Sequence, residues 1–125
     1  MSKEIKVIVK KPGEPVGRMQ FVGNTLENLQ RIVGGPIETV PVLEDVICIC
    51  NEEGKLRNLP DNFILGRRYP DLIVGTAIIC GVDGDEFTDL PDDFDIDVWR
   101  VALNGWGNWQ HGGAGTASTK HTLGT

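Results

Sequence analysis

The chain has 125 residues, of which 40% are hydrophobic, and this is enough for one modest core and a single domain. Its formal net charge of −6 argues against general nucleic-acid binding, because that binding depends on cationic contacts to phosphate. No apolar run approaches the ~20 residues of a membrane span, and the charged, alternating N-terminus does not fit a signal peptide. We therefore expect a cytoplasmic protein that does not enter membranes, and its three cysteines fit that compartment.

The N-terminal segment Glu4–Lys10 predicts a strand. Ile5, Val7 and Val9 point to one side, while the other side carries charged residues and Ile8, so one face is expected to be wetter. A loop rich in proline and glycine follows, and the residues after it form either a short strand or the approach to a helix.

A short amphipathic helix is predicted at Thr25–Val33. Asn24 and Glu27 fit a capping box at its start, and Gly34 and Gly35 end it because glycine accepts the left-handed conformation. Its apolar stripe consists of Leu26, Leu29, Ile32 and Val33. A helix this short is marginal alone, so the stripe must pack on a sheet.

Three more strands are expected to complete that sheet. Pro41 marks an edge strand after the helix, and Val46–Cys50 has the continuous apolar character of a buried central strand. Leu72–Cys80 is a second long apolar strand, in which Gly75 indicates a bend or bulge. The Asp-Gly pair within Gly81–Asp85 then predicts a hairpin.

The region between the two long strands is predicted to be irregular. Lys55–Leu59 fits a short return strand, and Phe63–Gly66 fits a helical turn. Arg67–Asp71 is expected to form a polar loop.

The C-terminal part fits helix or strand at Asp92–Leu103. Asp89 as a cap and Pro91 in the first turn favour helix. Beyond it, the chain is rich in glycine, serine and threonine without periodicity. We predict a single α+β domain at 1–104 and a flexible tail at 105–125. The domain is expected to have a mixed or antiparallel sheet, one helix packed across it and a second, C-terminal helix.

Three segments together resemble a known protein family. They are VGGPIETV (Val33–Val40), NEEGKLRNLPDN (Asn51–Asn62) and DLIVGTAIICG (Asp71–Gly81). The family they resemble consists of short bacterial and phage proteins that are known only as a domain of unknown function. It is frequent on phages, plasmids and other mobile elements of Gram-positive bacteria. The resemblance covers roughly the first two thirds of the chain and implies a genomic setting, but no catalytic residues.

The three cysteines allow two readings. Cys48 and Cys50 lie on the same face of one predicted strand and Cys80 ends another, so adjacent strands would bring three thiolates together as zinc ligands, with His111 or His121 as the fourth. Cysteine is also among the most buried residue types and often a plain small hydrophobe. The spacing is wrong for a zinc knuckle, so buried core thiols are the preferred reading and no metal is predicted.

The one compact basic cluster outside the first strand is Arg67 and Arg68. Paired arginine donors suit phosphate or carboxylate, and a loop between strands is a common place for binding groups. Asn62 would add neutral donors, and Glu38 would orient an arginine. The competing reading is an ordinary solvated pair of charges.

Known catalytic motifs are missing from the sequence. It contains no GxGxxG or P-loop pattern, and no Ser–His–Asp or Cys–His arrangement is convincing. We therefore expect no cofactor, and a binding function rather than an enzymatic one. The hypothesis is an accessory protein of a phage or mobile element that binds a host protein or a small anionic ligand, in regulation or defence evasion. The alternative is a small enzyme or metal-binding protein that uses Cys48, Cys50 and Cys80.

Trp106 and Trp109 also leave two readings open. They lie beside glycines near the C-terminus, where they form either an exposed contact surface or a segment that folds back on the core. Trp99, further from the glycines, is expected to cap the core.

Overall fold

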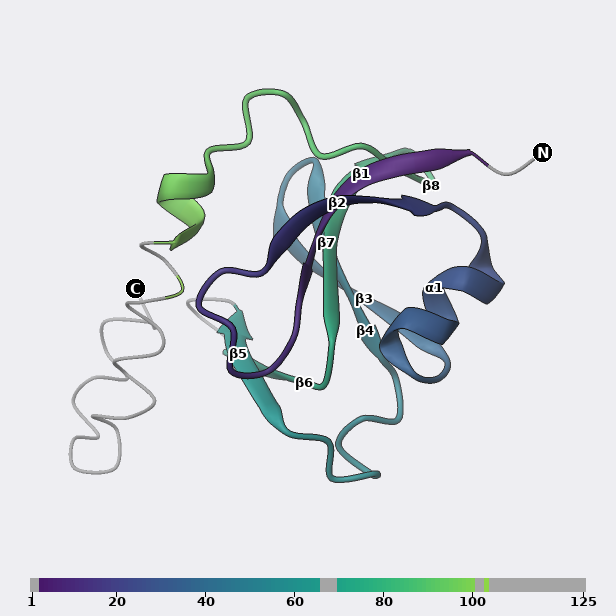
Figure 1. Ribbon diagram of the computed structural model, residues 1–125, viewed down its shortest axis with the longest axis vertical. Helices are drawn as coiled ribbons and strands as arrows, with labels where there is room; N and C mark the ends of the chain where they lie inside the picture. Colours follow the sequence, from purple (N-terminus) through teal and green to yellow (C-terminus); the bar gives the residue numbers. More distant parts are fainter. Residues whose placement is uncertain (1–2, 66–69, 101–102, 104–125) are drawn as a thin grey trace.

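A computed structural model describes residues 3–65, 70–100 and 103 of the chain (Figure 1). Antiparallel strands dominate these residues, and the helix α1 (Leu26–Val33) follows the second strand. The strands are β1 (Glu4–Lys10), β2 (Arg18–Gly23), β3 (Ile37–Leu43), β4 (Val46–Asn51), β5 (Asp61–Leu65), β6 (Asp71–Val74), β7 (Ala77–Asp83) and β8 (Glu86–Thr88). Residues 96–100 and 103 are also helical.

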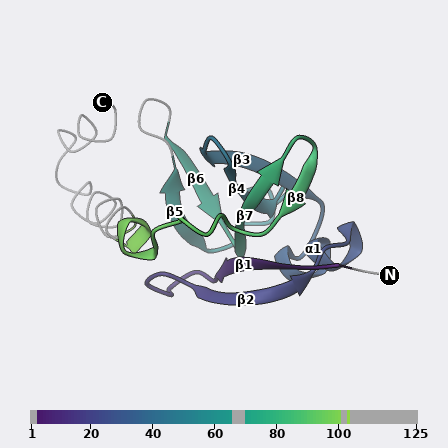
Figure 2. The same cartoon turned by 90° about the horizontal axis from the view of Figure 1, so that it is seen from above.

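The larger sheet has six antiparallel strands. Its main path runs β2-β1-β7-β4-β3, and β8 pairs with the C-terminal end of β7. β5 and β6 form a separate two-stranded antiparallel sheet. α1 lies on one side of the larger sheet and the β5–β6 hairpin on the other (Figure 1, Figure 2). The predicted single α+β domain, with an antiparallel sheet and a helix packed across it, is confirmed.

The larger sheet buries a hydrophobic cluster on each face. The helix-side core consists of Ile5, Val7, Val9, Val22, Leu29, Val33, Ile49, Ile78 and Cys80. The hairpin-side core consists of Ile8, Val46, Cys48, Cys50, Phe63, Leu65, Ile73, Ala77, Ile79, Leu90, Trp99 and Leu103. The face of β1 that was predicted to be wetter is therefore buried at Ile8 and Lys10, because the β5–β6 hairpin covers it.

α1 begins one residue later than the predicted cap implied. The N-cap is Thr25, whose side chain accepts a hydrogen bond from the backbone N–H of Asn28. Asn24 is not the cap, because its side-chain amide donates to the carbonyl oxygen of Phe87 at 3.0 Å. The predicted glycine stop is confirmed: Gly34 has φ 88°, the left-handed conformation of a C-cap.

The apolar run predicted as one strand at Leu72–Cys80 divides between the two sheets. Gly75 has φ 73°, and the chain turns there from β6, which pairs with β5, into β7. The predicted bend at Gly75 is thus confirmed. Periodicity alone gave no sign of the division, because both halves are apolar and buried.

Two predictions between the long strands are wrong. Lys55–Leu59 is a series of turns, closed by a hydrogen bond from the backbone N–H of Leu59 to the carbonyl of Gly54. Phe63 belongs to β5 and not to a helical turn, because pairing with β6 buries it in the hairpin-side core. Tertiary pairing decides the conformation of such short segments.

The C-terminal helix is shorter than predicted within the described residues. Asp95, and not Asp89, caps it, since its carboxylate accepts hydrogen bonds from the N–H groups of Asp97 and Val98. The indole of Trp99 meets the Phe63 ring edge-on at 5.6 Å and donates to the carbonyl of Val16, so it caps the core as expected. The predicted tail at 105–125, with its tryptophans and histidines, lies outside the described residues.

Candidate functional site

The predicted anion site falls only partly within the described residues. Arg67 and Arg68 lie outside them. Asn62 is a structural contact: its side-chain amide donates to the carbonyls of Lys10 at 2.9 Å and Gly75 at 2.7 Å, so both N–H donors are used within the protein. Glu38 lies on β3, exposed to solvent, and the structure gives Asn62 and Glu38 no shared contact.

Lys10 is a buried cation held by the same asparagine. Its ammonium donates to the side-chain oxygen of Asn62 and lies 5.4 Å from the centre of the Phe63 ring. All 18 acidic side chains of the protein lie within the described residues, and none forms an ion pair with Lys10. Burial lowers the pKa of Lys10 below its ordinary value of 10.5, although the charge of Glu14 opposes this shift.

The cysteines do not converge. In the pairing of β4 with β7, Cys80 lies opposite Ile47 and Cys48 lies opposite Ile79. Side chains of successive strand residues point to opposite faces, so Cys48 and Cys50 enter the hairpin-side core while Cys80 enters the helix-side core. The alternative of a site that joins all three thiols is therefore wrong.

The thiols are buried, as expected of core cysteines. Burial raises the pKa of Cys80 to about 12. A hydrogen bond with Cys50, together with burial, raises the pKa of Cys48, and the same hydrogen bond lowers the pKa of Cys50. Within the part of the chain that the structure describes, no group of three or more His, Cys, Asp or Glu side chains is arranged to hold a metal ion.

A small cavity lies between β3, β4 and β6, beside Cys50. Glu38 and the ion pair of Lys55 with Asp71, 2.9 Å apart, also line it. Its volume of about 40 Å³ accommodates little more than a water molecule. Glu38 thus faces Lys55 and Asp71 across this cavity, which is too small for an organic ligand.

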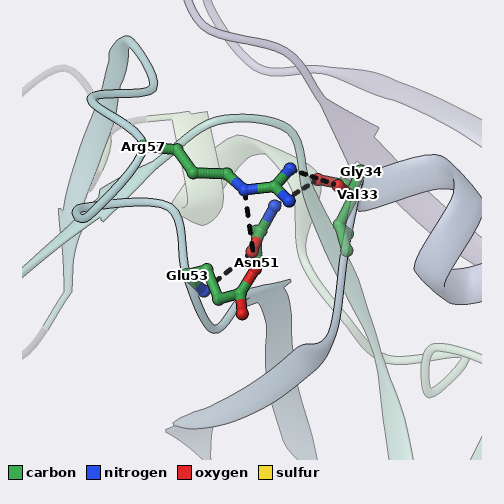
Figure 3. Close-up of polar contacts among 5 residues, drawn as sticks. All are labelled: Val33, Gly34, Asn51, Glu53 and Arg57. Carbon is green, nitrogen blue, oxygen red and sulfur yellow. Dashed lines mark hydrogen bonds and ion pairs between the residues drawn. The ribbon is translucent and has the colours of Figure 1, made fainter.

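A third group of polar residues joins the C-terminus of α1 to the turns after β4 (Figure 3). The buried side chain of Asn51 donates to the carbonyl of Val33 at 3.2 Å and accepts from the N–H of Glu53 at 2.8 Å. Arg57 donates to the carbonyl of Gly34 at 3.4 Å and pairs with Glu53 at 3.5 Å. We call this group the helix–turn junction.

The helix–turn junction satisfies carbonyl groups that every helix leaves without a partner at its C-terminus. It also explains the second glycine of the VGGP segment. A Cβ atom at Gly35 would lie 2.9 Å from the side-chain nitrogen of Asn51, closer than packing allows. Two of the three segments that carry the family resemblance therefore meet here to hold the fold, and their polar groups bind one another.

The two strands at the ends of the main path of the larger sheet, β2 and β3, differ. β3 carries Pro41 and a register irregularity between Pro41 and Leu43, which are common means of blocking an edge against further pairing. β2 has neither, and it lies along the outer margin of the ribbon (Figure 2). Two of its large apolar side chains, Met19 and Phe21, are 49% and 65% exposed. Among the described residues, no strand covers this edge.

A shallow groove of about 420 Å³ runs between β2 and α1. Its walls are Phe21, Val22 and Gly23 on the strand side, and Thr25, Asn28, Arg31 and Ile32 on the helix side. Arg31 is its charged residue, and the described lining contains no carboxylate. We call Met19–Phe21 together with this groove the β2 edge, and it is the candidate binding surface.

Sequence reasoning did not find the β2 edge. The segment RMQFVG contains no motif, and it was predicted only as a short strand or an approach to the helix. The available signal was the alternation of Met19 and Phe21 with polar neighbours, next to a strand that already alternates. Which edge stays open depends on the strand order, and that order is a property of the whole sheet.

These features define a small α+β domain in which β3, at one end of the main strand path, is blocked and β2, at the other end, is open. The comparison with protein families matches residues 5–101 to the family described as "Domain of unknown function (DUF3846)", and the chain belongs to that family. No match was found among curated proteins or among solved structures. No helix in the described part of the chain is long and apolar enough to cross a membrane.

Proposed function

We propose that this protein is a non-enzymatic accessory protein of a phage or other mobile element, and that it acts by binding a host protein. The observation that carries the proposal is the exposed β2 edge. Large apolar side chains at the unpaired edge of a strand expose surface that becomes buried when a partner binds. The resemblance of three segments to proteins of mobile elements supplies the setting, and the hydrogen bonds of the helix–turn junction hold the end of α1 beside β4.

The polar groups elsewhere in the described residues support a binding role as well. Asn51 and Asn62 use their side-chain hydrogen bonds within the fold. Lys55 and Asp71 pair with each other. Among the described residues, the β2 edge combines exposed apolar area, a cation and a groove, and this is the composition of a small contact surface.

A capture experiment with matched variants tests the proposal. Phe21→Lys places a charge on the β2 edge, and Leu56→Lys places the same charge on another exposed leucine, which is 87% exposed in the turns after β4. We expect one host protein to be retained from a lysate by the wild type and by Leu56→Lys, and to be lost with Phe21→Lys. Equal retention by all three proteins would show that the partner binds elsewhere.

A small anionic ligand is the second proposed partner, and it rests on the sequence of Arg67 and Arg68. Two adjacent arginines offer paired donors to a phosphate or carboxylate. In a chain of net charge −6, an anion approaches against the mean field and needs such a local cationic site. Native mass spectrometry of the purified protein is the direct search for that ligand.

A further inference from the structure

The backbone of β2 has two unpaired residues at its outer side. The backbone N–H of Asn24 donates to the carbonyl of Lys3 at 2.6 Å, so Lys3 and Asn24 form a hydrogen-bonded pair in the antiparallel ladder. Such pairs alternate along the ladder, and the register places Lys6 opposite Phe21 as a non-bonded pair. The N–H and C=O of Phe21 and of Met19 therefore point away from β1.

The other side of β1 gives an independent check of this alternation. The N–H of Lys6 donates to the carboxylate of Asp89 at 2.7 Å, and the carbonyl of Lys6 accepts from the N–H of Leu90 at 2.8 Å. Both groups of Lys6 thus point away from β2, as a non-bonded pair requires. Within the described residues, no hydrogen bond reaches the outward groups of Met19 or Phe21.

The groove limits where a partner can pair. The carbonyl of Gly23 also points outward, but the side-chain amide of Asn28 already donates to it at 2.8 Å. The free stretch is therefore Met19 to Phe21, with two N–H donors and two carbonyl acceptors. This is the pattern that an extended segment uses when it joins a sheet as a new strand.

The two faces of the β2 edge differ in chemistry. Met19 and Phe21 lie on the hairpin side, opposite Ile8 and Lys6 of β1. On the helix side, Arg31 lines the groove. Arg18 lies on the same side, because it is opposite Val9 of the helix-side core, and the Arg18 side chain is 82% exposed. Side chains of an added strand would alternate between these faces, so apolar residues would meet Phe21 and acidic residues would meet Arg31.

We propose that an extended segment of the partner, with apolar and acidic side chains in alternation, adds to the sheet as a strand beside β2. This inference rests on the proposed function and names the chemistry of the bound segment. A second copy of the chain fits less well. Antiparallel pairing of Met19 with Phe21 of a second copy would bring the second copy's Arg18 opposite Val22, into the groove that holds Arg31. Arg18 and Arg31 would then meet as like charges, and the exposed pairing of Arg18 with Glu14, at 3.7 Å, would offset only part of their repulsion.

The probe is a short synthetic peptide of alternating valine and glutamate, and its control has lysine in place of glutamate. We expect the glutamate peptide to bind and the lysine peptide to bind at least about tenfold more weakly. Arg31→Gln should weaken binding of the glutamate peptide roughly tenfold, since a charged hydrogen-bond partner is lost. Arg100→Gln, an exposed arginine of the C-terminal helix, is the matched control and should leave the affinity unchanged.

N-methylated peptides identify the orientation of the added strand. In antiparallel pairing, the residues directly opposite Met19 and Phe21 point their N–H groups at β2, and their side chains share the face of Phe21. Methylation of the valine amides would then abolish binding, and methylation of the glutamate amides would not. Parallel pairing reverses this result. Equal effects of both methylated peptides would overturn strand addition.

Amide exchange of the isotope-labelled protein gives the second readout. In the free protein, the amides of Met19 and Phe21 should exchange rapidly and those of Gln20 and Val22 slowly. The glutamate peptide should slow exchange at Met19 and Phe21 alone. Protection of these two amides in a dimeric free protein would overturn the proposal in favour of a second copy.

The outcomes separate this inference from the proposed function. If the glutamate peptide does not bind, but Phe21→Lys still loses the host protein, then strand addition is wrong and the binding function stands. If neither the peptide nor the host protein depends on the β2 edge, both proposals fail.

Discussion

The helix–turn junction and the β2 edge use their polar groups in opposite ways. At the junction, Asn51 and Arg57 satisfy the carbonyls at the end of α1, and the turn after β4 is bonded to the same side chains. At the β2 edge, the outward N–H and C=O groups of Met19 and Phe21 meet no described partner. The difference teaches that the segments with recognisable sequence patterns hold the fold. The candidate binding surface lies on β2, a strand without any motif.

The largest expected effect comes from breaking the junction. Asn51→Leu keeps the side-chain size but leaves the carbonyl of Val33 and the N–H of Glu53 without their partners. An unsatisfied buried group costs about 1–3 kcal/mol, and the N–H of Glu53 is half-buried, so we expect the free energy of unfolding to fall by roughly 2–4 kcal/mol in a denaturant titration. Affinity for the glutamate peptide should not change while the protein is folded.

Arg57→Ala is the control within the same junction. Its contacts are exposed, so its loss should cost no more than about 1 kcal/mol. A loss as large as that of Asn51→Leu would mean that the exposed contacts, and not the buried asparagine, stabilise the junction.

The second prediction tests whether the β2 edge is the only binding region. If a small ligand is found, we expect it to be anionic and to depend on Arg67 and Arg68. Arg67→Ala with Arg68→Ala should weaken its binding at least about tenfold by titration calorimetry, because charged hydrogen-bond partners are lost. The thermal midpoint should hardly move. A neutral or cationic ligand, or unchanged affinity, would remove this site from consideration.

The smallest effect concerns the other internal contact, between Lys10 and Asn62. Burial lowers the pKa of Lys10 in the folded protein, so between that lowered pKa and 10.5 the unfolded chain binds more protons than the folded one. The contribution of Lys10 to the free energy of unfolding should therefore rise as the pH rises through this window.

Lys10→Met should remove that alkaline rise, and Lys11→Met, at an exposed position, should keep it. Denaturant titrations of the three proteins over the alkaline range give the measurement. A rise of equal size in Lys10→Met would assign it to another group.

Local sequence patterns predicted the elements whose conformation depends on neighbours in the chain. Gly34 and Gly75 were correctly placed as a helix end and a bend, because few other residues accept a positive φ. The strand at Val46–Asn51 and the hairpin after β7 followed from composition and turn chemistry. The cap at Thr25 was misassigned by one residue because asparagine and threonine are both good N-caps.

Features that depend on the arrangement of strands could not be predicted. Periodicity placed Cys48 and Cys50 on one face correctly, but only the register of β4 with β7 sends Cys80 to the other. The alternation of β1 placed Lys10 on the solvated face, because the neighbouring sequence contains no signal that the β5–β6 hairpin covers that face. The openness of β2 is likewise set by strand order.

The central position of β7 has a consequence for how the chain acquires its structure. β7 pairs with β1, β4 and β8, and its contact with β1 joins Ile8 to Ile79. Non-local pairings of this kind slow folding, because a long loop must close before the contacts form. During synthesis, β1 and β4 emerge long before β7. Until β7 is made, the edges of β1 and β4 that pair with it have no partner. A nascent chain that stops before Ala77 therefore exposes apolar strands that the finished protein buries, and such exposed strands favour aggregation.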